Sequence, residues 1–478
     1  MNRRVFALAS LATVVSAAGL SAQGLDRTRP PALGPAPALR LPSVQTATLP
    51  NRLRLAVIEM HEVPVVDISI VIDAGAVADP ADLPGLATFT ANMLDEGAGR
   101  RSALEISEEA DFLGASLGTT AGYDVASVFL HVPKRQLRPA LDLMADVVLR
   151  PTFADSEIAR QRELRRTAIL QQRDQPVAMA NTSFPAIIFG DQHPYGRPLG
   201  GNEASTAMLS RDQVSQLYQT YYRPEHARVL VVGDVTLAEA ERLVSERFGA
   251  WENGPSVVAR SRAAEPAART VYLVDKPGAA QSVIRIGNVG VARSTEDYFP
   301  LQVLNTILGG SFTSRLNQNL RETHGYTYGA NSQFVMRQSA GPFQAGSSVQ
   351  SSKTDSALIE FMRELRRIRD EEVPQAELDK AKAYIALGLP GNFETTQGAA
   401  AQFRELLTYG LPLEYYDSYV QRINAVTAAD VQRVARRYID IDHLAIVVVG
   451  DRSQIEAGVR ALNEGPISVR DMWGQEVR

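Results

Sequence analysis

Two segments of the sequence occur twice with nearly the same offset, and this repetition constrains the fold more than any other feature. ISIVIDAGAV, which contains Gly75, has a counterpart in SVIRIGNVGV, which contains Gly290. VLVVGD, with Gly233, is matched by IVVVGD, with Gly450. Matching offsets at two separate landmarks indicate an internal duplication. We therefore expect two homologous halves built from similar elements.

The mixture of segment types predicts the fold class. Runs rich in Val and Ile with partial alternation, such as LRLAVIEM, are typical of strands, and amphipathic runs such as LRPALDLMADVVL indicate helices. Because the two types do not alternate strictly, we expect α+β halves with an α/β-sandwich architecture. The expected division of the chain is a signal peptide over 1–22, a proline-rich extended leader over 23–50, a first half over 51–252, a linker over 253–269, a second half over 270–466 and a tail over 467–478.

The first residues have the layout of an export signal. Two arginines precede an apolar run from Val5 to Leu20, and small residues follow up to Ala22. We expect cleavage near Ala22 and a periplasmic location, by either the general secretory or the twin-arginine route. An uncleaved membrane anchor is the alternative, although the run is short and contains Ser, Thr and Gly.

Composition excludes several classes of function. A net charge of −5 and a pI near 5.8 give no support for nucleic-acid binding. The absence of cysteine rules out disulfides, thiolate metal ligands and a cysteine nucleophile. The six histidines include no pair with the spacing of one helical turn. These features leave a soluble exported protein without an obvious catalytic centre of its own.

Several segments in the same order resemble the pitrilysin/insulinase zinc peptidases, or inverzincins. They include PGLATFTANML, HPYGRPLGG, YYRPEHARVLVVGD, LGGSFTSRLNQNLRETHGYTYGA and LEYYDSYVQRINAVTAADVQRVARRYI. Together they span nearly the whole mature chain. The resemblance implies two homologous α+β halves joined by a linker and folded around a substrate cavity.

The zinc motif of that family is degenerate in this sequence. Active members carry H-x-x-E-H on the first helix, where two histidines one turn apart hold Zn²⁺ and the glutamate activates water. At the matching positions this chain has Thr88, Ala91 and Asn92. The position of the third ligand falls on Ala168, and that of its supporting acid on Gln161. We therefore expect no catalytic zinc in this chain.

A second family feature is retained. In active members an Arg, followed seven residues later by a Tyr, binds substrate opposite the metal, and these positions are Arg321 and Tyr328. We expect a helix that carries Arg321 and ends near Gly325, followed by a strand that begins at Tyr328. Tyr326 is a second candidate hydroxyl.

Three functions remain open at the level of sequence. The resemblance implies the non-zinc subunit of a heterodimeric periplasmic zinc metallopeptidase, whose homologous H-x-x-E-H partner supplies the zinc and whose substrates are peptides. The alternative is a structural or peptide-binding pseudopeptidase with no share in catalysis. An enzyme of another kind, using hydroxyls near Ser311, lacks a paired base and acid.

Overall fold

A computed structural model describes residues 41–254 and 268–477. The expected signal peptide (1–22) lies outside these residues, as do most of the expected leader (23–50) and most of the expected linker (253–269). None of the helices in the described ranges has the length and apolar character needed to cross a bilayer.

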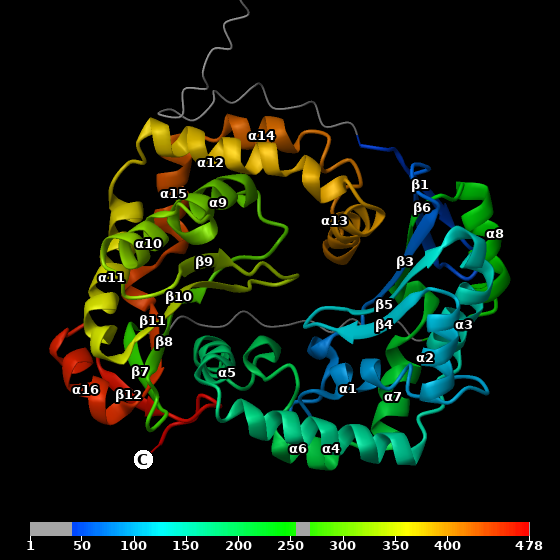
Figure 1. Ribbon diagram of the computed structural model, residues 1–478, viewed down its shortest axis with the longest axis horizontal. Helices are drawn as coiled ribbons and strands as arrows, with labels where there is room; N and C mark the ends of the chain where they lie inside the picture. The colour runs from blue at the N-terminus through cyan, green and yellow to red at the C-terminus, as the bar shows by residue number, and fades with distance from the viewer. Residues whose placement is uncertain (1–40, 255–267, 478) are drawn as a thin grey trace, which may run out of the picture. The chain divides into compact units, whose positions relative to one another are not determined.

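The first half of the described chain forms a six-stranded sheet in the order β1-β2-β6-β3-β5-β4 (Figure 1). Only β2 and β6 are parallel, and the other neighbours are antiparallel. Its strands are β1 (Val44–Thr48), β2 (Arg54–Glu59), β3 (Val65–Ile72), β4 (Ser116–Ala121), β5 (Ala126–Pro133) and β6 (Ala227–Gly233). Its helices are α1 (Leu86–Asn92), α2 (Ala103–Phe112), α3 (Leu137–Leu149), α4 (Asp155–Gln172), α5 (Pro176–Phe189), α6 (Glu203–Met208), α7 (Arg211–Tyr221) and α8 (Leu237–Phe248).

The second half forms another six-stranded sheet, in the order β12-β7-β11-β8-β10-β9. Its strands are β7 (Thr270–Asp275), β8 (Gln281–Val289), β9 (Ala330–Phe334), β10 (Pro342–Gln350), β11 (Ala445–Gly450) and β12 (Ile467–Arg470). Its helices are α9 (Tyr298–Asn305), α10 (Arg315–Asn317), α11 (Thr354–Asp370), α12 (Gln375–Gly388), α13 (Thr396–Tyr409), α14 (Tyr419–Ala425), α15 (Ala428–Tyr438) and α16 (Arg452–Ala461). Two π-helical segments flank α10: η5 (Thr306–Gly310) and η6 (Gln318–Thr323).

The two sheets confirm the expected duplication. Five strands have the same order and the same directions in both halves, so that β2, β6, β3, β5 and β4 correspond to β7, β11, β8, β10 and β9. The sixth strand differs: β1 runs antiparallel to β2, whereas β12 runs parallel to β7. The α+β class and the duplicated halves are therefore both present.

The sixth strands correct the expected ends of the folded region. β1 lies within residues assigned to the extended leader, and β12 lies within residues assigned to the tail. Both strands are short, and neither has a hydrophobic pattern that separates it from loop sequence. Pairing with an edge that is already formed supplies the backbone hydrogen bonds that fix them.

Each sheet is covered on one face by a helix from the other half of the sequence. α13 packs on β3 and β6, and α5 packs on β8 and β11. Side chains alternate between the two faces of a strand. In β11, Val447 and Val449 belong to the apolar cluster with Phe184 of α5, while Ile446 and Val448 belong to the cluster of the second half's own helices.

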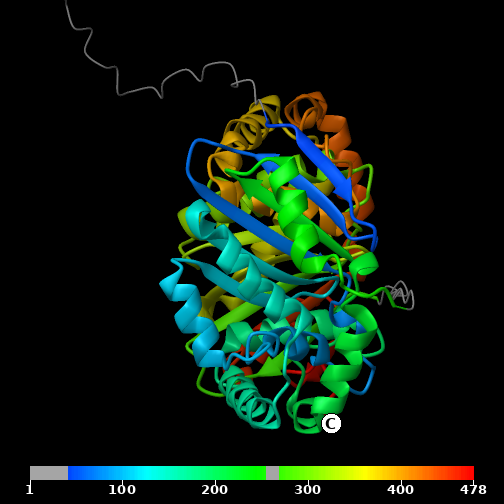
Figure 2. The same cartoon turned by 90° about the vertical axis from the view of Figure 1, so that its right-hand side faces the viewer.

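Helices of the first half cover the opposite face of their own sheet. α3 packs on β5 and α8 packs on β2. Figure 2 views this half from the side where α3 and α8 lie, with its strands in blue and cyan and with β6 in green. Both faces of the central strands β3 and β11 are thus buried, whereas the edge strands β4 and β9 keep exposed side chains.

Candidate functional site

The helix at the position of the zinc motif is short and its first turn is fixed by a buried carboxylate. Asp79 accepts hydrogen bonds from the backbone N–H groups of Gly85, at 2.8 Å, and Ala87, at 2.7 Å. These are amides at the start of α1, which have no partner within the helix. Burial raises the pKa of Asp79 to about 7, although the two amides and the charges of Arg197 and Arg165 favour its ionised form.

An arginine side chain lies on the face of α1 where a metal would be expected. Nη1 of Arg165, from α4, donates to the carbonyl of Gly85 at 2.7 Å and to Oγ1 of Thr88 at 3.2 Å. Its guanidinium also stacks on the ring of Phe89, 4.9 Å from the centroid. Burial lowers the pKa of Arg165 to about 10, so it remains charged at neutral pH. A fixed cation therefore joins α1 to α4 at this position.

The five degenerate positions do not fit a zinc ion. The Thr88 hydroxyl is within hydrogen-bonding distance of the carbonyls of Gly85 and Leu199. Ala91 is fully buried in the core. The remaining three are Asn92, which is exposed, Gln161, which donates to Glu96, and Ala168, which is exposed on α4.

Zinc in proteins is held by imidazole, thiolate or carboxylate groups, and none of the five residues carries one. Across residues 41–254 and 268–477, no group of three or more His, Cys, Asp or Glu side chains has the arrangement of a metal site. The residues at the position of the zinc motif therefore do not form a ligand set for zinc. The cationic group beside α1 is the guanidinium of Arg165.

The retained Arg and Tyr lie in the second half, at the end of a π-helical segment. Arg321 is within η6, and Gly325 follows in the left-handed conformation at φ 64°, which agrees with the expected helix end. The strand begins later than expected, because β9 starts at Ala330 and Tyr328 precedes it in a loop. Thr327 anchors this loop by donating to the carbonyl of Ser348 at 2.8 Å.

The two side chains differ in their surroundings. The Arg321 guanidinium stacks on the ring of Phe312 at 4.5 Å and lies 3.5 Å from a carboxylate oxygen of Glu322. Tyr328 is 93% exposed. No hydrogen bond or ring contact joins Arg321 to Tyr328 within the described chain. Tyr326, the second candidate, is half-buried and stacks on His324.

A polar contact that the sequence did not reveal links the two halves. The Tyr195 hydroxyl donates to Asp124 at 2.5 Å and accepts from the backbone N–H of Ser339 at 3.2 Å. The second oxygen of Asp124 accepts from the backbone N–H of Gln338 at 3.1 Å. Burial raises the pKa of Asp124. The Arg337 guanidinium stacks on Tyr195 at 4.5 Å.

Sequence signals for these additional residues are weak. Tyr195 lies in HPYG, one of the segments behind the family resemblance, but the pattern does not name Ser339 as its partner. Arg165 is one of four arginines in α4, so nothing in that helix singles it out. Ser311, named for its hydroxyl, donates to the carbonyl of Thr306 and not to a catalytic base.

The arrangement defines a class of protein: a duplicated α+β chain whose first half keeps the framework of a metallopeptidase but not its metal ligands. Comparison with protein families agrees. Residues 54–202 match the family model "Insulinase (Peptidase family M16)", and residues 208–385 match "Peptidase M16 inactive domain". The chain belongs to the M16, or pitrilysin/insulinase, peptidase family.

Individual relatives cover most of the chain. It is 27% identical over 420 residues to an "Uncharacterized zinc protease" of Mycobacterium leprae, covering 86% of this chain and 93% of the relative. It is 24% identical over 426 residues to a "Probable mitochondrial-processing peptidase subunit beta" of Arabidopsis thaliana, covering 86% of this chain and 79% of that protein.

A solved structure supports the same fold. The "peptidase M16 inactive domain" from Pseudomonas fluorescens superposes with a TM-score of 0.81 at 26% identity, covering 85% of this chain and 98% of that one. A protease from Helicobacter pylori gives a TM-score of 0.80 at 20% identity, covering 86% of this chain and 100% of that one.

Proposed function

We propose that this chain is the non-zinc subunit of a heterodimeric, exported zinc peptidase. In this proposal Arg321 and Tyr328 bind the peptide substrate, and a homologous subunit with an H-x-x-E-H helix supplies the zinc. The chain alone does not cleave peptides.

One observation carries the proposal. The side of α1 at the position of the zinc motif is occupied by another side chain of this chain, whereas Tyr328 is exposed and free to bind a ligand. The metal face is occupied by Arg165, which is bound to α1 by two hydrogen bonds. Tyr328, in contrast, is held out into solvent by an anchored loop, and its hydroxyl has no partner in the described residues. An exposed phenol without an internal role is available to an external ligand.

The sheets provide edges suited to an extended peptide. β4 and β9 are the last strands of their sheets, and each has a hydrogen-bonded neighbour on only one side. A peptide added as a further strand would bind through its backbone, which requires no particular sequence. One of the relatives is named as a subunit, which supports assembly with a second chain.

The proposal is tested with a purified complex of this chain and an H-x-x-E-H homologue, using a quenched-fluorescent peptide. Replacement of Arg321 by Ala, or of Tyr328 by Phe, removes a hydrogen bond to substrate, worth about 1.5–3 kcal/mol where a charged group takes part. At about 1.4 kcal/mol per factor of ten, kcat/KM of the complex should fall roughly ten- to hundredfold. Zinc content and subunit association should not change.

Arg366→Ala is the control, because Arg366, on α11, pairs with Glu464 away from Arg321 and Tyr328. Wild-type rates in both the Arg321 and the Tyr328 variants, in a complex that assembles normally, would refute the proposal. A structural or peptide-binding pseudopeptidase would then be the better description.

Metal content and processing are tested on the chain alone. We expect far less than one zinc per molecule after purification and no peptide hydrolysis, because the five matching side chains offer no ligand set. Stoichiometric zinc together with chelator-sensitive activity would contradict this. The intact mass of exported protein should correspond to a chain that begins at Gln23 or within a few residues of it, and a mass that includes Met1 would contradict export with cleavage.

A further inference from the structure

A cavity of about 420 Å³ lies in the second half, and no residue of α1 or α4 lines it. Its walls come from η5, η6, α10, α11 and α12, so they include both π-helical segments. Such segments occur often at functional sites. The charged residues of its lining are, besides His324, the cations Arg315, Arg363, Arg367 and Lys380 and the single carboxylate Glu377.

Arg315 lines this cavity and has a buried N–H group without a hydrogen-bond partner. Its side chain is only 6% exposed, and its Nε and Nη2 donate to one oxygen of Glu377 at 2.9 and 2.7 Å. Its Nη1 is buried without a hydrogen-bond partner. A buried guanidinium with an unpaired N–H is costly, and native structures rarely keep one without a water, ion or ligand to satisfy it.

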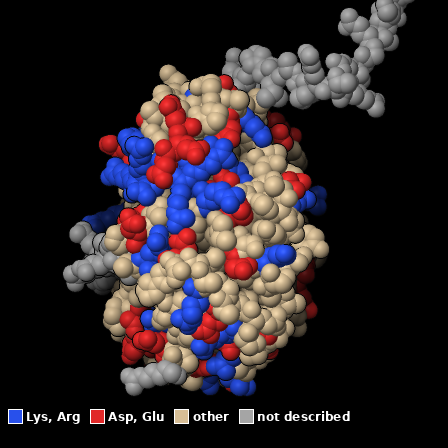
Figure 3. Space-filling view, turned by 90° about the vertical axis from the view of Figure 1, so that its left-hand side faces the viewer, with Lys and Arg blue, Asp and Glu red and all other residues tan. Residues whose placement is uncertain are grey.

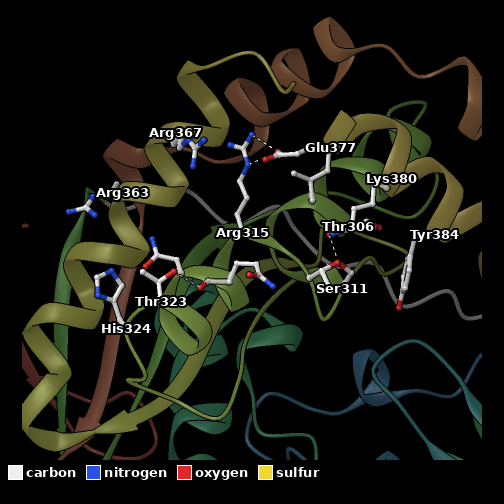
Figure 4. Close-up of a pocket in the computed structure, with 15 residues that line it drawn as sticks. Thr306, Ser311, Arg315, Thr323, His324, Arg363, Arg367, Glu377, Lys380 and Tyr384 are labelled. Atoms are coloured by element: carbon white, nitrogen blue, oxygen red, sulfur yellow. Dashed lines mark hydrogen bonds and ion pairs between the residues drawn. The ribbon is translucent and has the colours of Figure 1, made fainter. Parts of the chain in front are cut away.

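Other cationic side chains line the same cavity. Lys380, one turn after Glu377 on α12, makes no hydrogen bond or ion pair with the described residues. Figure 4 shows the guanidinium groups of Arg315 and Arg367 at the same end of the cavity, although they come from different elements. Figure 3 shows that Lys and Arg side chains, with Asp and Glu among them, gather on the side of the molecule where α11 lies.

Carboxylates next to the cavity bind its arginines or Asn319, although Oε2 of Glu364 is buried without a hydrogen-bond partner. Asn319 Nδ2 donates to Glu360 at 2.9 Å and to Glu364 at 2.8 Å, and neither carboxylate belongs to the cavity lining. Glu360 also binds Arg363, and Glu371 binds Arg367 through Nε at 3.1 Å. These pairs hold the guanidinium groups in place and balance the charges of Arg363 and Arg367, so that Lys380 is the lining Lys or Arg without a carboxylate partner in the described residues.

From these observations we infer that the cavity binds a small oxyanion, a ligand that carries a phosphate or carboxylate group. Arginine forks and a lysine are the side chains that recognise such groups, through charge-assisted hydrogen bonds. The hydroxyl of Thr313 in the same wall can add a further donor, whereas those of Ser311 and Thr323 already donate to backbone carbonyls. The ligand would contact η6, the segment that also carries Arg321.

The test is titration of the full-length exported chain with pyrophosphate, inorganic phosphate and citrate, each by calorimetry at matched ionic strength. We expect saturable binding of at least one of the three. Replacement of Lys380 by Ala, or of Arg367 by Ala, should weaken that binding about tenfold, the effect of losing one charge-assisted hydrogen bond. Preference for the phosphates or for citrate identifies the oxyanion.

Matched controls lie beside both residues. Lys382, on the same helix as Lys380, donates to the carbonyl of Asn424, and Arg366, adjacent to Arg367, pairs with Glu464; neither lines the cavity. Lys382→Ala and Arg366→Ala should therefore bind as the wild type does. The inference is overturned by the absence of saturable binding for all three anions, or by equal losses in the cavity variants and the controls.

Discussion

The guanidinium of Arg165 should contribute measurably to the stability of the first half. In Arg165→Met the apolar stem is retained, but the hydrogen bonds to Gly85 and Thr88 and the stacking on Phe89 are lost. A hydrogen bond from a charged group is worth about 1.5–3 kcal/mol, and an exposed to partly buried cation–π contact about 0.5–2 kcal/mol. The cost of burying the guanidinium, which lowers the pKa of Arg165, offsets part of this gain.

We expect a net loss of about 2 kcal/mol in the free energy of unfolding. With an unfolding entropy near 2.1 cal/mol/K per residue, roughly 420 folded residues correspond to a decrease in Tm of about 2 °C. Differential scanning calorimetry resolves a change of this size. Hydrogen exchange should also increase in α1 more than elsewhere, because both lost hydrogen bonds end on that helix or its cap.

The adjacent Arg166→Met is the matched control. Arg166 is exposed and pairs with Glu163 one turn away on the same helix, and such surface pairs contribute about 0–1 kcal/mol. Its Tm should stay within measurement error of the wild type. If both variants melt at the same temperature, the contacts of Arg165 with Gly85, Thr88 and Phe89 do not stabilise the first half.

Two further predictions concern other buried polar groups. Because the pKa of Asp79 is raised from 3.8 to about 7 in the folded chain, its burial cost is absent below pH 4, grows as the pH rises and is constant above pH 7. The free energy of unfolding should therefore fall between pH 4 and 7, and in Asp79→Asn it should change less with pH, as measured by denaturant unfolding at stepped pH. An equal change with pH in the variant and the wild type would exclude Asp79 as the cause. Tyr195→Phe removes the hydroxyl shared by Asp124 and the Ser339 amide and should cost about 1–3 kcal/mol, with faster hydrogen exchange of the Ser339 amide. Exchange as slow as in the wild type would show that this contact does not hold the halves together.

Much of the fold could be predicted because its signals are local. The recurrence of Gly75 and Gly233 at Gly290 and Gly450 indicated the duplication, and both halves have the same order of five strands. Apolar periodicity indicated the segments that form β2 and α3. It missed β1 and β12, since these short strands depend on pairing with a neighbour and not on a pattern of their own.

The sequence predicted which residue types the candidate site contains, but not their exposure or their contacts. The loss of every ligand type at the metal positions, from Thr88 to Ala168, is a statement about side-chain chemistry and needs no coordinates. Arg321 and Tyr328 were named by resemblance, and their role stays a prediction. The exposure of Tyr328 and the stacking of Arg321 on Phe312 depend on how a loop and a π-helical turn pack.

The sequence by itself determined that this chain has two related halves, a degenerate metal motif and no ligands to rebuild it, because repetition and side-chain chemistry are properties of the residues. Only the tertiary structure decided what replaces the metal and where unused polar groups gather. Arg165 reaches Thr88 across 77 positions of sequence, and Asp124 meets Gln338 across 214. Contacts at such separations follow from the packing of distant helices and sheets, which no local pattern encodes.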